Sequence, residues 1–189
     1  VSSQIQYHSM IDGTLELVAG ALLDVDYHTN IASNIKISGD TTIDVASDMT
    51  LTYSGDAIDV NTYQLTFLGT GTIDNSNAAV LLSNSQGLII FADDITVALV
   101  KVEANSVSGK GIQVKSAGAK VTKLNLLANL ILIFDKEHYV FNIENLVVSA
   151  KATLETEGSR GLVNITQLQQ DNLDALLTLR NITAKVQEE

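Results

Sequence analysis

The stretch SGDTTIDVASDMTLTYSGDAIDV, residues 38–60, carries the same Ser-Gly-Asp triplet twice, sixteen positions apart. A short β-branched run that contains aspartate follows each triplet, and no helical pattern separates the two. Glycine, serine and aspartate favour tight turns, whereas isoleucine, valine and threonine favour strands. The segment therefore predicts a polar turn followed by a short strand, used repeatedly.

Similar apolar runs behind polar turns recur along the chain, at irregular spacings of about fifteen to twenty-five residues. In NIKIS the residues Ile35 and Ile37 flank Lys36, an alternation that is typical of a half-buried strand. A single coil of two or three such strands cannot bury its own apolar side, so coils must stack on one another. The sequence predicts an all-β fold: a parallel β-solenoid, or β-helix, of short irregular coils. The runs include GTLELVAG at 13–20, QLTFLGTG at 64–71, GLIIFADD at 87–94, GIQVKSAG at 111–118 and GLVNITQL at 161–168.

Proline is absent from all 189 residues, although a chain of this length ordinarily carries roughly nine. Proline cannot donate to a β-ladder, so its absence favours strands that are paired on both edges. The alternative is an antiparallel β-sandwich, whose strands recur every eight to twelve residues. Tight-hairpin signals are scarce, with Asp12-Gly13 the one instance, which favours the solenoid.

We expect one solenoid domain over residues 1–189, with an N-terminal cap within 1–13 and a C-terminal capping segment within 166–189. TQLQQDNLDALLTLR, residues 166–180, spaces its leucines as on a helical face, so this segment is either a short terminal helix or one more coil. Asparagines that precede isoleucine are predicted to stack at one corner and to pass hydrogen bonds between coils. They are Asn30, Asn34, Asn142, Asn164 and Asn181.

Short Ile/Val strands, Gly-Asp and Ser-Gly turns and irregular coils of about twenty residues resemble the right-handed parallel β-helices of secreted bacterial proteins. Filamentous-haemagglutinin-like adhesins, autotransporter passengers and the pectin-lyase-like superfamily share this pattern. The resemblance implies a secreted or cell-surface location and a role as a stalk or binding rod. The beginning VSSQIQYHS agrees with a processed mature end or an excised fragment.

The net charge of −11 lies almost entirely in the first half of the chain. Residues 1–100 contain twelve acidic side chains and one basic side chain, Lys36, whereas residues 101–189 contain ten of each. An acidic surface repels phosphate backbones, which argues against nucleic acid as a partner. No apolar run approaches the eighteen residues of a membrane span, so we expect no membrane insertion.

No nucleophile elbow, Walker loop, zinc-protease helix or dinucleotide fingerprint is present in the sequence. The chain also lacks cysteine, which excludes disulfides and thiolate chemistry. We therefore expect a non-catalytic structural or adhesive module that partners with itself or with adjacent domains by end-to-end stacking, or with a host or matrix glycan or protein. The alternative is a carbohydrate-active enzyme or phage-spike-type glycan-binding β-helix, with paired carboxylates as acid and base.

Aspartates in successive turns are the best candidate site. Repeated carboxylates with almost no lysine nearby repel one another, and calcium with its oxygen ligands would relieve that repulsion. The alternative is a solvated acidic face that prevents lateral aggregation. A weaker metal hypothesis joins His8 and His28, twenty residues apart, with Asp24 or Asp26. The candidate calcium ligands are Asp40, Asp44, Asp48, Asp56 and Asp59.

Two further surface functions are consistent with the front half of the chain. Tyr53 and Tyr63 are candidates for a small platform on which a neutral glycan would stack. Dense threonines raise ice binding as a minor alternative, although their spacing is uneven. The threonines are Thr41, Thr42, Thr50, Thr52, Thr62, Thr66, Thr70 and Thr72.

Overall fold

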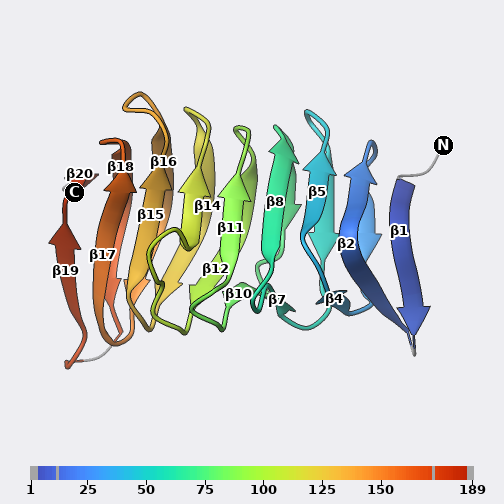
Figure 1. Ribbon diagram of the computed structural model, residues 1–189, viewed down its shortest axis with the longest axis horizontal. Helices are drawn as coiled ribbons and strands as arrows, with labels where there is room; N and C mark the ends of the chain where they lie inside the picture. The colour runs from blue at the N-terminus through green and yellow to red at the C-terminus, as the bar shows by residue number, and fades with distance from the viewer. Residues whose placement is uncertain (1–3, 12, 172, 187–189) are drawn as a thin grey trace.

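The computed structural model describes residues 4–11, 13–171 and 173–186, and in this range the chain winds into a column of about eight coils (Figure 1). Every regular element in the described ranges is a strand, and the strands of successive coils pair in parallel. The predicted parallel β-solenoid is confirmed, and the antiparallel sandwich is not formed. Residues 1–3, 12, 172 and 187–189, which belong to the two expected capping segments and to the Asp12-Gly13 turn signal, lie outside the described residues.

Two sheets form the opposite walls of the column, and we call them sheet 1 and sheet 2. Sheet 1 runs through β1 (Gln4–Ile11), β2 (Thr14–Val25), β5 (Thr41–Val45), β8 (Gln64–Gly69), β11 (Leu88–Phe91), β13 (Gly111–Val114), β15 (Leu130–Phe134), β17 (Lys151–Gly158) and β19 (Leu176–Arg180), with β4 (Ile35–Ile37) beside β2. Sheet 2 runs through β3 (Thr29–Ile31), β6 (Thr50–Tyr53), β9 (Thr72–Asp74), β12 (Thr96–Val102), β14 (Ala119–Leu126), β16 (Val140–Val148), β18 (Leu162–Gln170) and β20 (Thr183–Val186), with β10 (Val80–Leu82) between β7 (Ile58–Asp59) and β12.

The length of a coil varies along the column. Thr41 pairs with Leu65, 24 positions further along the chain, whereas Ile112 pairs with Leu132, only 20 positions further. Parallel strands need a connection that returns the chain to the same end, and here the return passes through the opposite sheet. The irregular repeat in the sequence therefore comes from loops of different length between paired strands.

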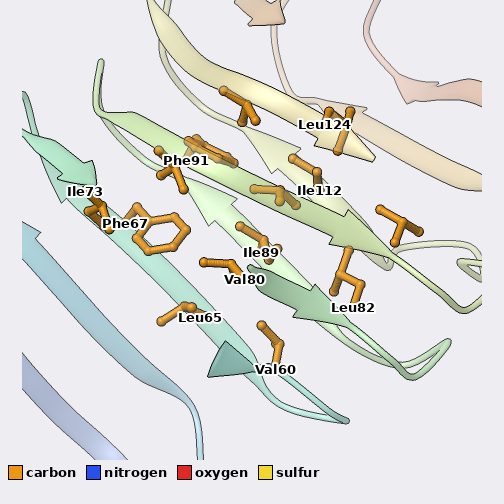
Figure 2. Packing of buried hydrophobic residues seen from close by; sticks show 14 of the residues in the cluster. Val60, Leu65, Phe67, Ile73, Val80, Leu82, Ile89, Phe91, Ile112 and Leu124 are labelled. Carbon is orange, nitrogen blue, oxygen red and sulfur yellow. The ribbon is translucent and has the colours of Figure 1, made fainter. Parts of the chain in front are cut away.

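The core fills the space between the sheets with alternate side chains from every coil (Figure 2). Phe67, Phe91, Phe134 and Phe141 are fully buried and supply most of the aromatic volume. The ring centroids of Phe67 and Phe91 lie 5.5 Å apart, and those of Phe91 and Phe141 lie 5.3 Å apart. Both separations are in the range of favourable tilted aromatic pairs. Aliphatic residues occupy most remaining positions, as the low aromatic content predicts.

The two Ser-Gly-Asp triplets have the same structural role at two corners of the column. A Cβ on Gly39 would lie 2.3 Å from the backbone nitrogen of Ala19, and one on Gly55 would lie 2.8 Å from the carbonyl oxygen of Ser33. Glycine is therefore required because neighbouring coils approach closely there. The aspartate of each triplet then bonds to another coil: Asp40 accepts from the Gln64 amide at 2.9 Å, and Asp56 accepts from the Asn34 side chain at 2.7 Å.

The predicted single ladder of Asn-Ile asparagines is wrong, because these residues lie in different elements. Asn164 donates to Asn142 at 3.0 Å on sheet 2, which is the one pair that follows the prediction. A corner ladder does exist elsewhere: Asn105 accepts from the Asn129 amide at 2.9 Å, and Asn129 accepts from the Thr153 amide at 2.8 Å. In contrast, Asn30 lies opposite Thr52, Asn34 bonds Asp56, and Asn181 occupies a turn with φ of 54°.

The two ends of the column differ. At the N-terminal end β1 pairs antiparallel with β2, and the core residues beneath it are almost fully buried, with Leu15 at 3% and Leu17 at 0% exposure. At the other end the described residues of 166–180 follow the second of the two expected alternatives, one more coil, and form no helix. β18 continues to Gln170, and β19 begins at Leu176. Leu168 extends the column of paired residues that contains Leu124 and Leu146, so the ladder outweighs the helical spacing of the leucines. Nowhere in the described ranges is there a helix able to cross a membrane.

Candidate binding groove

The aspartates proposed as calcium ligands lie partly in connections and partly in strands, and hydrogen bonds within the chain engage most of them. Asp40, Asp48 and Asp56 lie in connections, whereas Asp44 lies in β5 and Asp59 in β7. Beyond the contacts of Asp40 and Asp56, Asp59 accepts from the Ser83 hydroxyl at 2.6 Å and from the Asn61 amide at 2.9 Å. Asp48 occupies a turn with φ of 61°. Across the described ranges no three His, Cys, Asp or Glu side chains gather in a way that could hold a metal. Calcium binding by these residues stays a prediction.

The surroundings of the Asp44 carboxyl group raise its pKa. Partial burial raises the pKa of Asp44 above its ordinary value of 3.8, and repulsion from Asp24, Asp93 and Asp26 raises it further. Asp24 and Asp44 lie directly opposite each other on β2 and β5. The parallel ladder thus places like charges side by side, which is destabilising when both are ionised.

Replacing Asp44 with asparagine is expected to stabilise the protein at neutral pH. Because the folded-state pKa is raised, the carboxyl group favours the folded state only while it is protonated, and this contribution is lost as pH rises through the folded-state pKa. We expect Asp44→Asn to raise the melting temperature by about 1–3 °C at pH 7, with the gain shrinking as the pH approaches 3.8. Glu137→Gln, which removes a charge from an exposed loop, is the matched control. A gain that does not depend on pH would contradict this electrostatic account.

Of the two tyrosines of the predicted glycan platform, Tyr53 lies in the core. The Tyr53 side chain is 2% exposed, and its hydroxyl accepts a hydrogen bond from the Ile35 amide at 3.0 Å. Burial raises the pKa of the Tyr53 hydroxyl, in agreement with a core position. Tyr63 is partly buried and packs against the core cluster. Tyr53 therefore presents no ring face to a ligand, because its ring fills the interior between the two sheets.

The two histidines of the weaker metal hypothesis lie in different elements. One lies in a strand of sheet 1, and the other lies in the connection that leads to sheet 2. His8 lies in β1, where its backbone pairs with Leu17. The Nδ1 atom of His28 accepts a hydrogen bond from the Thr50 amide at 3.2 Å. This bond fixes His28 to the next coil.

A concave region on the outer face of sheet 2 is the feature best suited to bind a ligand. Strict alternation fails there, because β12 turns two consecutive residues, Ala98 and Leu99, away from the core between the buried Val97 and Val100. Asn75, which is fully buried, holds this break: its Oδ1 accepts from the amides of Ala98 and Leu99 at 3.0 and 3.1 Å. An outward pair of this kind interrupts the alternation of buried and exposed residues, and Ala98 is left out of the paired register between β12 and β14.

The break repeats in the following coils and so becomes a continuous feature. Thr122 and Lys123 occupy it in β14, and Glu144 and Asn145 occupy it in β16. The Asn145 side chain donates to the Thr122 carbonyl at 3.3 Å, which connects the break in β16 to the break in β14. The result is a hollow of about 530 Å³ across β6, β9, β12, β14 and β16, which we call the sheet-2 groove.

One wall of the sheet-2 groove is a row of identical side chains. Thr50 pairs with Thr72, and Thr72 pairs with Thr96, so three threonines stand in register on β6, β9 and β12. All three are partly exposed. Neighbouring strands lie about 4.7–4.9 Å apart, so the hydroxyl groups repeat at that interval along the column.

The same row continues beyond the threonines. It passes through Lys120, Asn142, Asn164 and Lys185 on β14, β16, β18 and β20. A second hollow, of about 340 Å³, is lined by Asn142, Asn164 and Lys185. The polar row therefore follows much of the length of sheet 2.

Sequence reasoning identified part of this surface and missed the rest. Thr50 and Thr72 were among the threonines noted, whereas Thr42 and Thr66 pair with each other on sheet 1, and Thr41 is buried with its hydroxyl on the Ala21 carbonyl. The groove itself was not predicted. A signal exists, because two outward residues stand between buried apolar ones in VALV at 97–100, VTKL at 121–124 and IENL at 143–146, at matching places in consecutive coils.

Comparison with protein-family models, with curated proteins and with solved structures found no match for this chain.

Proposed function

We propose that this chain is a non-catalytic structural or adhesive module of a secreted or cell-surface rod, which extends by stacking at its C-terminal end. The proposal rests on the way the core ends. Val100, Leu124 and Leu146 stack in one inward row and are 0% exposed, whereas the next member, Leu168, is 45% exposed. Leu130 and Leu154 are also 0% exposed, and their next member, Leu179, is 43% exposed.

The backbone at this end supports the same proposal. Among the residues that the structure describes, β19 and β20 each pair with a strand on one side only, since they stand last in their sheets. An unpaired strand edge with apolar side chains behind it is a template for another strand. A hollow of about 580 Å³ lies beside it, lined by Leu179, Ile182 and Arg160 among others. A further coil, from a neighbouring domain or a second copy of the chain, would pair both edges and cover the leucines.

Charge distribution favours one mode of association between copies. The front half carries −11 and the back half is neutral, so contact between two front ends is repulsive, whereas contact that uses the C-terminal end is not. The coil-to-coil hydrogen bonds of Asp40, Asp56 and Asp59 support a structural use of these carboxylates. The secreted or surface location is proposed from the resemblance of the sequence pattern to secreted β-helices.

Sedimentation velocity over a range of concentrations tests this proposal. We expect reversible association that grows with concentration, and we expect Leu168→Lys combined with Leu179→Lys to abolish it, because two buried charges at the contact cannot be desolvated without cost. Leu127→Lys is the matched control, since Leu127 is 37% exposed in the turn between β14 and β15, away from the end of the column. Circular dichroism checks that each variant keeps its strands. A protein that stays monomeric near millimolar concentration would contradict the proposal.

A further inference from the structure

We propose that the sheet-2 groove binds a linear, neutral polysaccharide that lies along the column axis across β6, β9, β12 and β14. This inference rests on the proposed non-catalytic, adhesive role and adds the class of ligand and its site. It uses a different surface from the C-terminal end, so the two can succeed or fail separately.

The direction of the ligand follows from the direction of the groove. The Thr50, Thr72 and Thr96 row runs from coil to coil, perpendicular to the strands, and each step presents the same hydroxyl group at the ladder interval. A repeating ligand that extends along the column meets the same chemistry at every step. A sugar chain is such a ligand, because each unit offers hydroxyl groups that both donate and accept, as threonine does.

The apolar floor of the groove is suited to the C–H groups of a sugar ring. Ala98 and Leu99 turn outward at the break in β12 and line the hollow, so their methyl and methylene groups lie beside the threonine row. Lys123 and Asn145 continue the paired row of Leu99 onto β14 and β16, and Asp74 and Ser76 also line the hollow. Polar groups that fix orientation around an apolar floor are the usual composition of small-molecule and saccharide sites.

Electrostatics select a neutral polymer over an anionic one. The lining contains one carboxylate, Asp74, and one ammonium group, Lys123, so it offers no net positive charge. The coils that carry Thr50 and Thr72 belong to the front half of the chain, whose net charge is −11. A polyuronate or a sulfated glycan would be repelled along most of its length.

A peptide is a poorer occupant of this surface. The groove lies on the face of the sheet, and the backbone groups of β9, β12 and β14 already pair with strands on both sides. An incoming peptide therefore cannot add a strand here, which is the usual way in which a sheet binds an extended chain.

Titration followed by amide NMR spectra tests the inference with defined probes. Cellohexaose, xylohexaose and mannohexaose are the neutral probes, and hexagalacturonate is the charged comparison. We expect at least one neutral hexasaccharide to shift the amide signals of Thr72, Thr96 and Ala98, with hexagalacturonate producing no comparable shift. If no neutral probe moves these signals at millimolar concentration, or if only hexagalacturonate does, the inference is overturned.

The variant Thr50→Val/Thr72→Val/Thr96→Val removes three hydroxyl groups and keeps the β-branched shape that the strands favour. Losing several sugar hydrogen bonds is expected to weaken binding about tenfold or more. Thr42→Val/Thr66→Val removes an equivalent pair from sheet 1 and is expected to leave binding unchanged. Ala98→Phe, which fills the floor, is expected to abolish binding. Equal losses in the control would overturn the inference.

Two further measurements distinguish saccharide binding from catalysis and from ice binding. Shortening of the hexasaccharide during incubation would overturn the non-catalytic role while supporting the site. Shaping of ice crystals by the protein, without any shift by an oligosaccharide, would assign the threonine row to ice and would overturn the proposed ligand. Because sedimentation reports stacking independently, loss of sugar binding alone leaves the proposed rod module standing.

Discussion

Truncating Phe91 to alanine is expected to lower the free energy of unfolding by about 3–5 kcal/mol. Phe91 is fully buried in the middle of the column, opposite Phe67 on one side and Val114 on the other. Its ring also contacts the ring of Phe141 on sheet 2, so it joins the two walls. Alanine leaves a cavity that a stacked ladder cannot close, because backbone pairing fixes the distance between coils.

Equilibrium unfolding in urea, monitored by circular dichroism, measures this loss. Native domains have a total stability of about 5–15 kcal/mol, so Phe91→Ala removes a large share of it. Val107→Ala is the control, because Val107 is 39% exposed in a loop, and a change there is expected to stay within about 0.5 kcal/mol. A loss below about 1 kcal/mol at Phe91 would show that the two walls are not packed as described.

The second large effect is expected at Gly69, the last residue of β8. Gly69 has φ of 78°, and a Cβ there would lie 2.0 Å from the carbonyl oxygen of Val45 in the preceding coil. Alanine therefore adds both the strain of a left-handed backbone and a contact that forces two coils apart. We expect Gly69→Ala to lower the free energy of unfolding by more than about 2 kcal/mol.

Gly13 offers a control matched in backbone conformation. Its φ is 75°, but a Cβ there would have nothing within 4 Å. Gly13→Ala is thus expected to cost about 1 kcal/mol, the backbone strain alone. The difference between the two variants isolates the close approach between coils. Equal costs, measured by the same urea titrations, would contradict the tight stacking of β5 against β8.

The stacked coils were predictable because their physical cause is local. Ile35 and Ile37 alternate with Lys36, and the structure buries the two isoleucines and exposes the lysine. The absence of proline agrees with ladders in which most strands are paired on both edges. The alternation lies within a few neighbouring residues and the absence of proline is a matter of composition, so no knowledge of distant contacts was needed.

The positions that misled the prediction depend on contacts between coils. The leucines at 166–180 have helical spacing, but Leu168 lies where the Leu146 row requires a strand. Tyr53 was proposed as part of a surface platform because a tyrosine ring can stack on a sugar. The Ile35 amide from the neighbouring coil donates a hydrogen bond to the Tyr53 hydroxyl, so the side chain can be buried. The sheet-2 groove depends on breaks in alternation that lie in register in consecutive coils, and that register depends on loop lengths that a periodic pattern does not specify.

A map of strand neighbours by NOE spectroscopy on isotope-labelled protein is the most direct test of the parallel stacking of coils. We expect parallel contacts between residues one coil apart, with Thr66 close to both Thr42 and Ile90. The same pattern is expected on sheet 2, with Thr72 between Thr50 and Thr96. Antiparallel contacts that join residues 41–45 to residues 50–53 across a hairpin would contradict the parallel stacking.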